Sequence, residues 1–187
     1  MHTPPRYSLR PTVFLAAAAA LLGGCVDRAP VAPDAKPAAS SAPLALRQAA
    51  EEERAVATLR RVTARYHDLD VAKSEGFVLL HECENRPDEG PVGAVYYNPG
   101  RLLDGKIDPA SPDALIYEPP RRDGGQPKLV GAEFATLDAG QPAPEFLGHT
   151  FQREEEFGVF GLHVWIWRHN PEGMFEEANP TVSCGAE

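Results

Sequence analysis

The stretch VFGLHVWIWR, residues 159–168, is the longest strand candidate of the chain and the best guide to its fold. Successive side chains of a β-strand point to opposite faces of the sheet. The alternation therefore predicts that Leu162, Val164 and Ile166 enter a hydrophobic core. On the other face it predicts a single row of two imidazoles and two indoles, formed by His163, Trp165, Trp167 and His169.

Shorter apolar runs of strand length precede this stretch, and residues typical of turns separate them. The runs are 77–81 (FVLLH), 95–97 (VYY), 114–117 (ALIY) and 129–136 (LVGAEFAT). Because no helical pattern lies between the runs, they predict a mostly antiparallel sheet. Gly124-Gly125 predicts a hairpin turn between the third run and the fourth.

Residues 44 to about 67 carry the clearest helical pattern. Apolar side chains recur there at three- and four-residue spacing, while charged residues occupy the other faces. A short second helix is predicted over 68–75, with Asp70 as its N-cap and Gly76 as its end. The apolar positions of the first helix are Val56, Leu59, Val62 and Tyr66.

The N-terminal residues have the layout of an export signal. Arg6 and Arg10 precede the apolar run 13–22 (VFLAAAAALL), which is too short to span a bilayer. The run ends in Leu-Gly-Gly-Cys at 22–25, which resembles the lipobox of bacterial lipoproteins. In that family the cysteine is lipidated and becomes the first residue of the mature chain, so the resemblance implies acylation of Cys25. The alternative is a chance thiol behind an ordinary cleaved signal peptide.

This interpretation divides the chain into three segments. Residues 1–24 are the predicted signal peptide, residues 25–43 the lipidated cysteine with a disordered tether rich in Pro, Ala and Ser, and residues 44–187 a single globular domain. The expected location is the cell envelope, where fatty acyl chains hold the protein. Val26, and not an aspartate, follows the cysteine. In lipoproteins this favours the outer membrane, with the domain facing the periplasm.

The predicted mature chain is acidic. Removal of residues 1–24, which hold two arginines and no acidic residue, changes the formal net charge from −9 to −11. This charge disfavours nucleic acid as a partner, because nucleic-acid binding depends on basic side chains that neutralise phosphates. It also disfavours anionic lipid head groups, so the acyl chains are the predicted membrane contact.

With Cys25 assigned to the lipid, two cysteines remain, in a compartment where disulfides persist. Cys83 and Cys184 are therefore predicted to pair, across 101 positions. The alternatives are two buried thiols or two metal ligands, although neither cysteine has a partner cysteine at the short spacing of zinc sites. The predicted fold class is α+β: one long N-terminal helix packed on a mostly antiparallel sheet, rich in loops, with one disulfide.

The row of imidazoles and indoles is the predicted ligand-binding surface. Indoles provide stacking area and an N–H donor, and both suit the lining of a ligand groove. The alternative is that both tryptophans pack beneath the N-terminal helix. The predicted ligand-binding set is His163, Trp165, Trp167, His169, Tyr96 and Tyr97.

A metal site is a second hypothesis, and no other cofactor is predicted. His163 and His169 would lie about 20 Å apart on a straight strand, so they cannot share an ion. A metal on His163 would need ligands from His81 or His149, or from Glu82 and Glu84. The sequence has no HExxH motif, phosphate-binding glycine loop, GxSxG elbow or EF-hand. The remaining acidic clusters are predicted to be turn formers and solvated charges: Asp104, Asp108, Asp113 and residues 154–156.

Several blocks of the sequence resemble a family of bacterial exported proteins and lipoproteins. They are Asn98-Pro99, 102–105 (LLDG), Asp108-Pro109, 115–119 (LIYEP), 162–167 (LHVWIW), Asn170-Pro171, 173–175 (GMF), Asn179-Pro180 and Cys184. The resemblance covers roughly residues 70–184 and implies one intact domain that ends at Cys184. Chains of this family often carry a histidine at the position of Val95. No activity is established for the family, so the resemblance implies none here.

These features predict a membrane-anchored lipoprotein that acts as a binding or accessory module at the cell envelope. Its partner, a small molecule or a protein, is not identified by the sequence. Two alternatives stay open. One is a metal-dependent or hydrolytic envelope enzyme that uses His163 with His81 and His149. The other is a structural envelope protein without a small-molecule site.

Overall fold

The computed structural model describes residues 43–122 and 124–185. The predicted signal peptide, the predicted acylation site Cys25 and the predicted tether up to residue 42 lie outside these residues. The fold, the disulfide and the candidate site residues of the domain lie inside them.

The long N-terminal helix, α1, spans Leu44–Thr63 and continues as a 3₁₀ turn, η1, over Ala64–His67. The start at Leu44 and the end at His67 agree with the helical pattern of the sequence. The helix buries Val56, Leu59 and Thr63 against the sheet, and Tyr66 of η1 extends the same buried stripe. Within the described residues, no helix is long and apolar enough to cross a membrane.

Two short helices complete the helical part. The helix α2 spans Leu69–Ser74, and α3 spans Pro99–Leu102. The N-cap of α2 is Asp68, whose carboxylate accepts a hydrogen bond from the backbone N–H of Asp70. The predicted N-cap at Asp70 is therefore wrong by two positions, because Asp70 already lies inside the helix.

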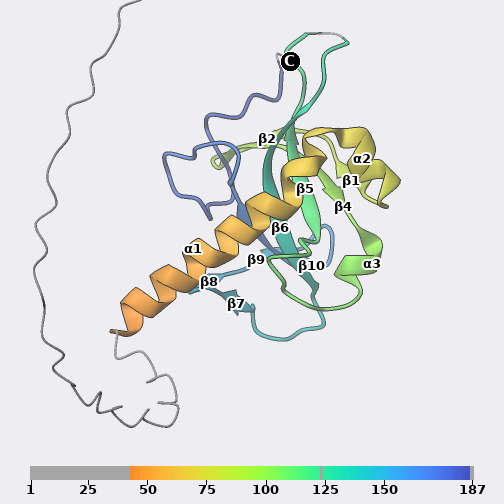
Figure 1. Ribbon diagram of the computed structural model, residues 1–187. Coiled ribbons are helices and arrows are strands. Elements are labelled where there is room, and N and C mark those ends of the chain that lie inside the picture. The colour runs from red at the N-terminus through yellow and green to blue at the C-terminus, as the bar shows by residue number, and fades with distance from the viewer. Residues whose placement is uncertain (1–42, 123, 186–187) are drawn as a thin grey trace, which may run out of the picture. The chain divides into compact units, whose positions relative to one another are not determined.

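Six antiparallel strands form the main sheet in the order β1-β4-β5-β6-β10-β9 (Figure 1). Their bounds are β1 Val78–His81, β4 Ala94–Tyr97, β5 Ala114–Glu118, β6 Lys128–Leu137, β9 Gln152–Glu154 and β10 Val159–Val164. Two small hairpins accompany it: β2 Glu84–Arg86 with β3 Gly90–Val92, and β7 Glu145–Phe146 with β8 His149–Thr150. The predicted α+β fold with a mostly antiparallel sheet is confirmed.

The two faces of the sheet carry different clusters. Leu115, Phe134 and Leu162 pack with Leu59 and Tyr66 on the face that α1 crosses (Figure 1). The opposite face carries a smaller apolar cluster, which holds Val95, Ala114, Ile116, Val130, Trp165 and Val182. The predicted core positions Leu162, Val164 and Ile166 all join the cluster beneath α1.

The predicted row of four side chains along the last strand is not formed. The strand β10 ends at Val164. The backbone bends there, and the N–H of Ile166 donates a hydrogen bond to the Val164 carbonyl at 2.9 Å. His163 and Trp165 keep to the face opposite α1, but Trp167 packs against the cluster beneath α1. Its Nε1–H donates to Thr63 Oγ1 at 3.1 Å. The alternation rule fails here because it holds only along extended backbone.

The disulfide between Cys83 and Cys184 is confirmed. It joins the connection between β1 and β2 to the C-terminal segment, with 5.1 Å between the two Cα atoms. The buried Glu118 carboxylate holds the same segment, because it accepts a hydrogen bond from the Ser183 N–H at 3.2 Å and pairs with Arg168. The C-terminal segment is thus tied to the sheet at two independent places.

Candidate functional site

A cavity of about 220 Å³ opens on the face of the sheet that α1 does not cover. Ala114 of β5 and Glu133 of β6 line it, while their neighbours Leu115 and Phe134 pack toward α1. Because side chains alternate along each strand, the cavity and the helix lie on opposite faces. Its other lining residues come from β1, β4, α3, the ends of β6 and β10, and the loops beside them: Leu80, Tyr97, Leu102, Asp113, Ala135, Leu137, Phe157 and Val159.

Most side chains that line the cavity are apolar, and so are the partly exposed side chains at its opening. Leu80 is 37% exposed and Leu137 is 48% exposed, although both side chains are large and apolar. Exposed apolar side chains around a hollow are typical of ligand-binding surfaces. The cavity is thus accessible from solvent past two leucines.

Two carboxyl groups lie among these apolar residues. Asp113 is 2% exposed and Glu133 is 6% exposed. The strand register brings them together, because Ala114 pairs with Glu133 and the Asp113 N–H donates to the Glu133 carbonyl at 3.0 Å. Asp113 Oδ2 accepts a hydrogen bond from the Ala135 N–H at 3.0 Å, which fixes the carboxyl group at the edge of β6.

His163 lies behind Glu133 and away from solvent, with 3% exposure. The two residues are direct partners in the register of β10 and β6. His163 Nε2 lies 3.7 Å from Glu133 Oε2, and Nδ1 lies 3.7 Å from Glu177 Oε2. Nδ1–H also donates to the Glu177 carbonyl at 2.7 Å. The imidazole therefore lies between two carboxylates.

This arrangement raises the pKa of His163 to about 9. Burial alone would lower the pKa, but the Glu177 and Glu133 carboxylates outweigh burial because both stabilise the imidazolium. His163 is consequently protonated at neutral pH. It supplies a buried positive charge directly behind the cavity.

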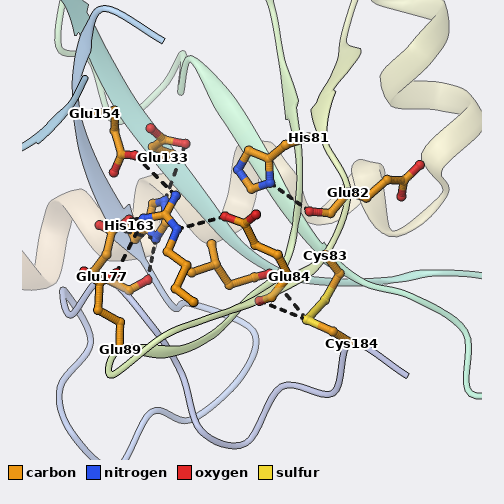
Figure 2. A network of polar contacts seen from close by, with 12 residues as sticks. His81, Glu82, Cys83, Glu84, Glu89, Glu133, Glu154, His163, Glu177 and Cys184 are labelled. Atoms are coloured by element: carbon orange, nitrogen blue, oxygen red, sulfur yellow. Dashed lines mark hydrogen bonds and ion pairs between the residues drawn. A yellow bond between two sulfur atoms is a disulfide. The ribbon is translucent and has the colours of Figure 1, made fainter. Parts of the chain in front are cut away.

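Arg86 of β2 extends the network on the far side of His163. Its guanidinium binds Glu177 Oε1 at 2.9 Å, Glu154 Oε2 at 3.2 Å and Glu84 Oε1 at 2.9 Å. Figure 2 shows Glu133, Glu154 and Glu177 gathered around His163 beside the disulfide. Burial and the nearby Glu177 raise the pKa of Glu154. Carboxylates and cations therefore alternate from the buried Glu133 and His163 to the half-buried Glu177, Arg86 and Glu154.

Asp113 has a less compensated environment. Burial raises its pKa to about 7, and the negative charges of Glu133 and Asp104 add to the effect. The Ala135 N–H and Arg101 act in the opposite direction but do not restore the usual value. Near neutral pH both the protonated and the ionised form of Asp113 are therefore populated, and such a shifted pKa is typical of functional carboxyl groups.

The structure brings only part of the predicted ligand-binding set to this cavity. Tyr97 lines it, and His163 lies behind Glu133. Tyr96 points to the other face, where its ring meets Tyr117 with 5.4 Å between centroids. Burial, followed by the charge of Glu82, raises the pKa of Tyr96.

The other members of the set line separate, more open hollows. Trp165, Trp167 and His169 border one of about 430 Å³, together with Arg60 and Arg168. Trp167 and His169 also border one of about 420 Å³ beside His67 and Lys128. The alternative that both tryptophans pack beneath the N-terminal helix holds for Trp167, whose indole donates to Thr63 of α1, but not for Trp165. Trp165 packs in the cluster on the opposite face, and its indole donates to the Glu176 carbonyl.

The three histidines of the metal hypothesis have different surroundings. His81 stacks on Phe157 with 5.6 Å between ring centroids, and its Nδ1 lies 2.8 Å from the Glu82 carbonyl. His149 stacks on Phe175 at 3.8 Å and faces Glu52 of α1 at 3.6 Å. Across residues 43–122 and 124–185, no group of three or more His, Cys, Asp or Glu is placed to hold a metal ion.

Sequence reasoning missed most of the charged residues of the site. Asp113 is not a solvated turn residue, because its carboxyl is buried at the cavity. Glu154 is not a solvated loop residue either, because it pairs with Arg86. A detectable signal was Glu133, a lone carboxylate inside the apolar run LVGAEFAT. The chain matches no protein-family model, and it matches no curated protein and no solved structure.

Proposed function

We propose that this protein is an exported, lipid-anchored domain of the cell envelope. We propose further that it binds a small molecule in the cavity on the sheet face that α1 does not cover. One observation carries the binding role: two carboxyl groups, nine-tenths or more buried, line an apolar cavity that opens to solvent. Keeping carboxyl groups in an apolar site lowers stability unless they gain partners. His163 and the Ala135 N–H offset part of this cost, and a ligand in the cavity would offset the rest.

Three features support export and anchoring. The N-terminal residues carry the export pattern and the lipobox-like Leu-Gly-Gly-Cys. Blocks of the sequence are similar to those of exported bacterial proteins and lipoproteins. The disulfide between Cys83 and Cys184 suits an oxidising compartment outside the cytoplasm.

Replacement of the anchoring cysteine tests the location. The Cys25→Ser protein is expected in the soluble fraction, because loss of the acyl chains removes the membrane contact. Fractionation of cells that express either protein, followed by mass spectrometry of the N-terminal peptide, measures both location and acylation. A Cys25→Ser protein that stays in the membrane fraction, or a wild-type peptide without acyl chains, would overturn the anchor.

Filling the cavity tests the binding role. Native mass spectrometry of the wild-type protein from envelope extracts is expected to show a non-covalently bound small molecule. Ala135→Phe should abolish this adduct, because Ala135 lines the cavity and its replacement occupies the same space. Ala57→Phe, on the exposed side of α1, is the matched control and should keep it.

Circular dichroism shows whether the Ala135→Phe protein has kept its fold, since an added ring in a packed site costs about 1–3 kcal/mol. Leu137→Trp, at the partly exposed mouth, obstructs entry without changing the interior and provides a second variant. A wild-type protein without any adduct, or an adduct that both variants retain, contradicts the binding role.

A further inference from the structure

Resting on the proposed binding role, we propose that the ligand of this cavity is a monovalent organic ammonium ion with a compact apolar body. The ammonium group would lie between Asp113 and Glu133, and the apolar body would contact the leucines and aromatic rings of the wall.

The donors already present leave both carboxyl groups open to a ligand. His163 Nε2 lies 3.7 Å from Glu133, which is an ion-pair distance and longer than a hydrogen bond. Asp113 accepts a hydrogen bond from the Ala135 N–H. A protonated amine has three N–H donors and no acceptor, so it can donate to more than one of the carboxyl groups that line the cavity.

The neighbouring cations are committed to other partners. Arg101 donates to the Pro112 carbonyl at 2.9 Å and to the Tyr66 hydroxyl at 3.1 Å, and its guanidinium lies 4.7 Å from the centre of the Phe77 ring. His163 divides its charge between Glu133 and Glu177. The charge facing the cavity is therefore negative, which disfavours an anionic ligand.

The apolar wall distinguishes an organic cation from a metal ion. A hard divalent cation takes six or more oxygen ligands, whereas this cavity offers two carboxyl groups among leucines and aromatic rings. Tyr97 and Phe157 present aromatic surface, which attracts cations through the ring quadrupole. An uncharged apolar ligand of the same shape would add no positive charge and no N–H donor beside either carboxyl group.

Proton exchange at Asp113 gives the proposal a second signature. The groups that act on Asp113 are Glu133, Asp104, Arg101 and the Ala135 N–H, and together with burial they place its pKa at about 7. A bound ammonium ion favours the ionised carboxylate and so displaces the proton. Affinity should therefore rise as the pH rises toward 7, by at most about tenfold per pH unit, and level off above it.

A matched probe series tests the charge directly. Isothermal titration calorimetry with the full-length protein would compare benzylamine with benzyl alcohol, its uncharged analogue, and with benzoate. Benzylamine should bind at least about tenfold more tightly than benzyl alcohol, because hydrogen bonds between charged groups are stronger than those that a neutral hydroxyl makes. Benzoate should show no binding.

Variants locate the effect. Glu133→Gln and Asp113→Asn should each weaken benzylamine binding by about tenfold or more, with little change for benzyl alcohol. Glu145→Gln, on the exposed side of β7, is the control and should bind benzylamine like the wild type. Asp113→Asn should also abolish the rise of affinity with pH.

The possible failures are distinguishable. If benzyl alcohol binds as tightly as benzylamine, the cavity is a binding site but the ammonium class is wrong. If no probe binds while native mass spectrometry shows an adduct that Ala135→Phe removes, the ammonium class is again wrong and the binding role stands. If neither probes nor adduct are found, both proposals fail.

Discussion

Replacement of His163 by glutamine is expected to lower the free energy of unfolding by about 3–5 kcal/mol at neutral pH, because removal of one partner leaves buried charges uncompensated. The imidazolium lies between the Glu133 and Glu177 carboxylates. Glutamine has a similar reach but no charge, so the two carboxylates would face each other across a neutral amide. Urea-induced unfolding, followed by tryptophan fluorescence, measures the change.

The pH dependence of stability identifies the charge as the cause. The pKa of His163 rises from an ordinary 6.5 to about 9 in the folded protein, so the folded state holds an additional proton between these values. Its contribution, about 3 kcal/mol for a shift of this size, is complete below pH 6.5 and is lost as the pH rises through 9. The wild-type protein should therefore lose stability over this range, and His163→Gln should not.

Asp113 adds a separate step at lower pH. Its pKa rises from an ordinary 3.8 to about 7, so the folded state again binds the proton more tightly than the unfolded state. Stability should consequently fall as the pH rises from 3.8 to about 7, and this fall should persist in His163→Gln. Asp113→Asn should remove the lower step and leave the upper one in place.

His169→Gln is the matched control, because His169 is exposed and its loss should change stability by less than about 0.5 kcal/mol. If His163→Gln shows the same decline between pH 6.5 and 9 as the wild-type protein, then His163 is not the group that titrates. The interpretation of a buried imidazolium would then be wrong.

The fold was predictable because its signals are local. Val56, Leu59, Thr63 and Tyr66 recur with helical spacing, and all four are buried on one stripe of the N-terminal helix. The apolar runs of the sheet are separated by turn residues and not by helices, and this pattern predicts that neighbouring strands pair antiparallel. The disulfide followed from cysteine counting, since only two cysteines remained after Cys25.

The site was hard to predict because it depends on register and on irregular segments. Glu133 and His163 face each other only because β6 and β10 pair with that register. Glu177 follows the last strand in a segment without regular structure, and it reaches Arg86 across 91 positions. The alternation predicts the wrong face for Trp167 because the bend after Val164 has no sequence signal comparable to Gly or Pro.

The double variant Cys83→Ser/Cys184→Ser is expected to lose about 2–5 kcal/mol in free energy of unfolding. The bridge closes a loop of 101 positions, and cross-linking such a long loop restricts the unfolded chain more than the folded one. The folded state should persist, since other contacts also hold the C-terminal segment. Val182 packs in the second cluster, and the Asn179 N–H donates to the Pro91 carbonyl at 3.0 Å.

Reductant separates the bridge from the serine substitutions. Urea unfolding of the wild-type protein with reductant should approach that of the double variant, whereas reductant should leave the double variant unchanged. Because the bridge stabilises chiefly through the unfolded chain, the upper pH step due to His163 should remain in both proteins. A wild-type protein whose unfolding midpoint is insensitive to reductant would show that the bridge adds nothing. Loss of the His163 step on reduction would show instead that the bridge also positions β2 and Arg86, which directly follow Cys83 in the chain.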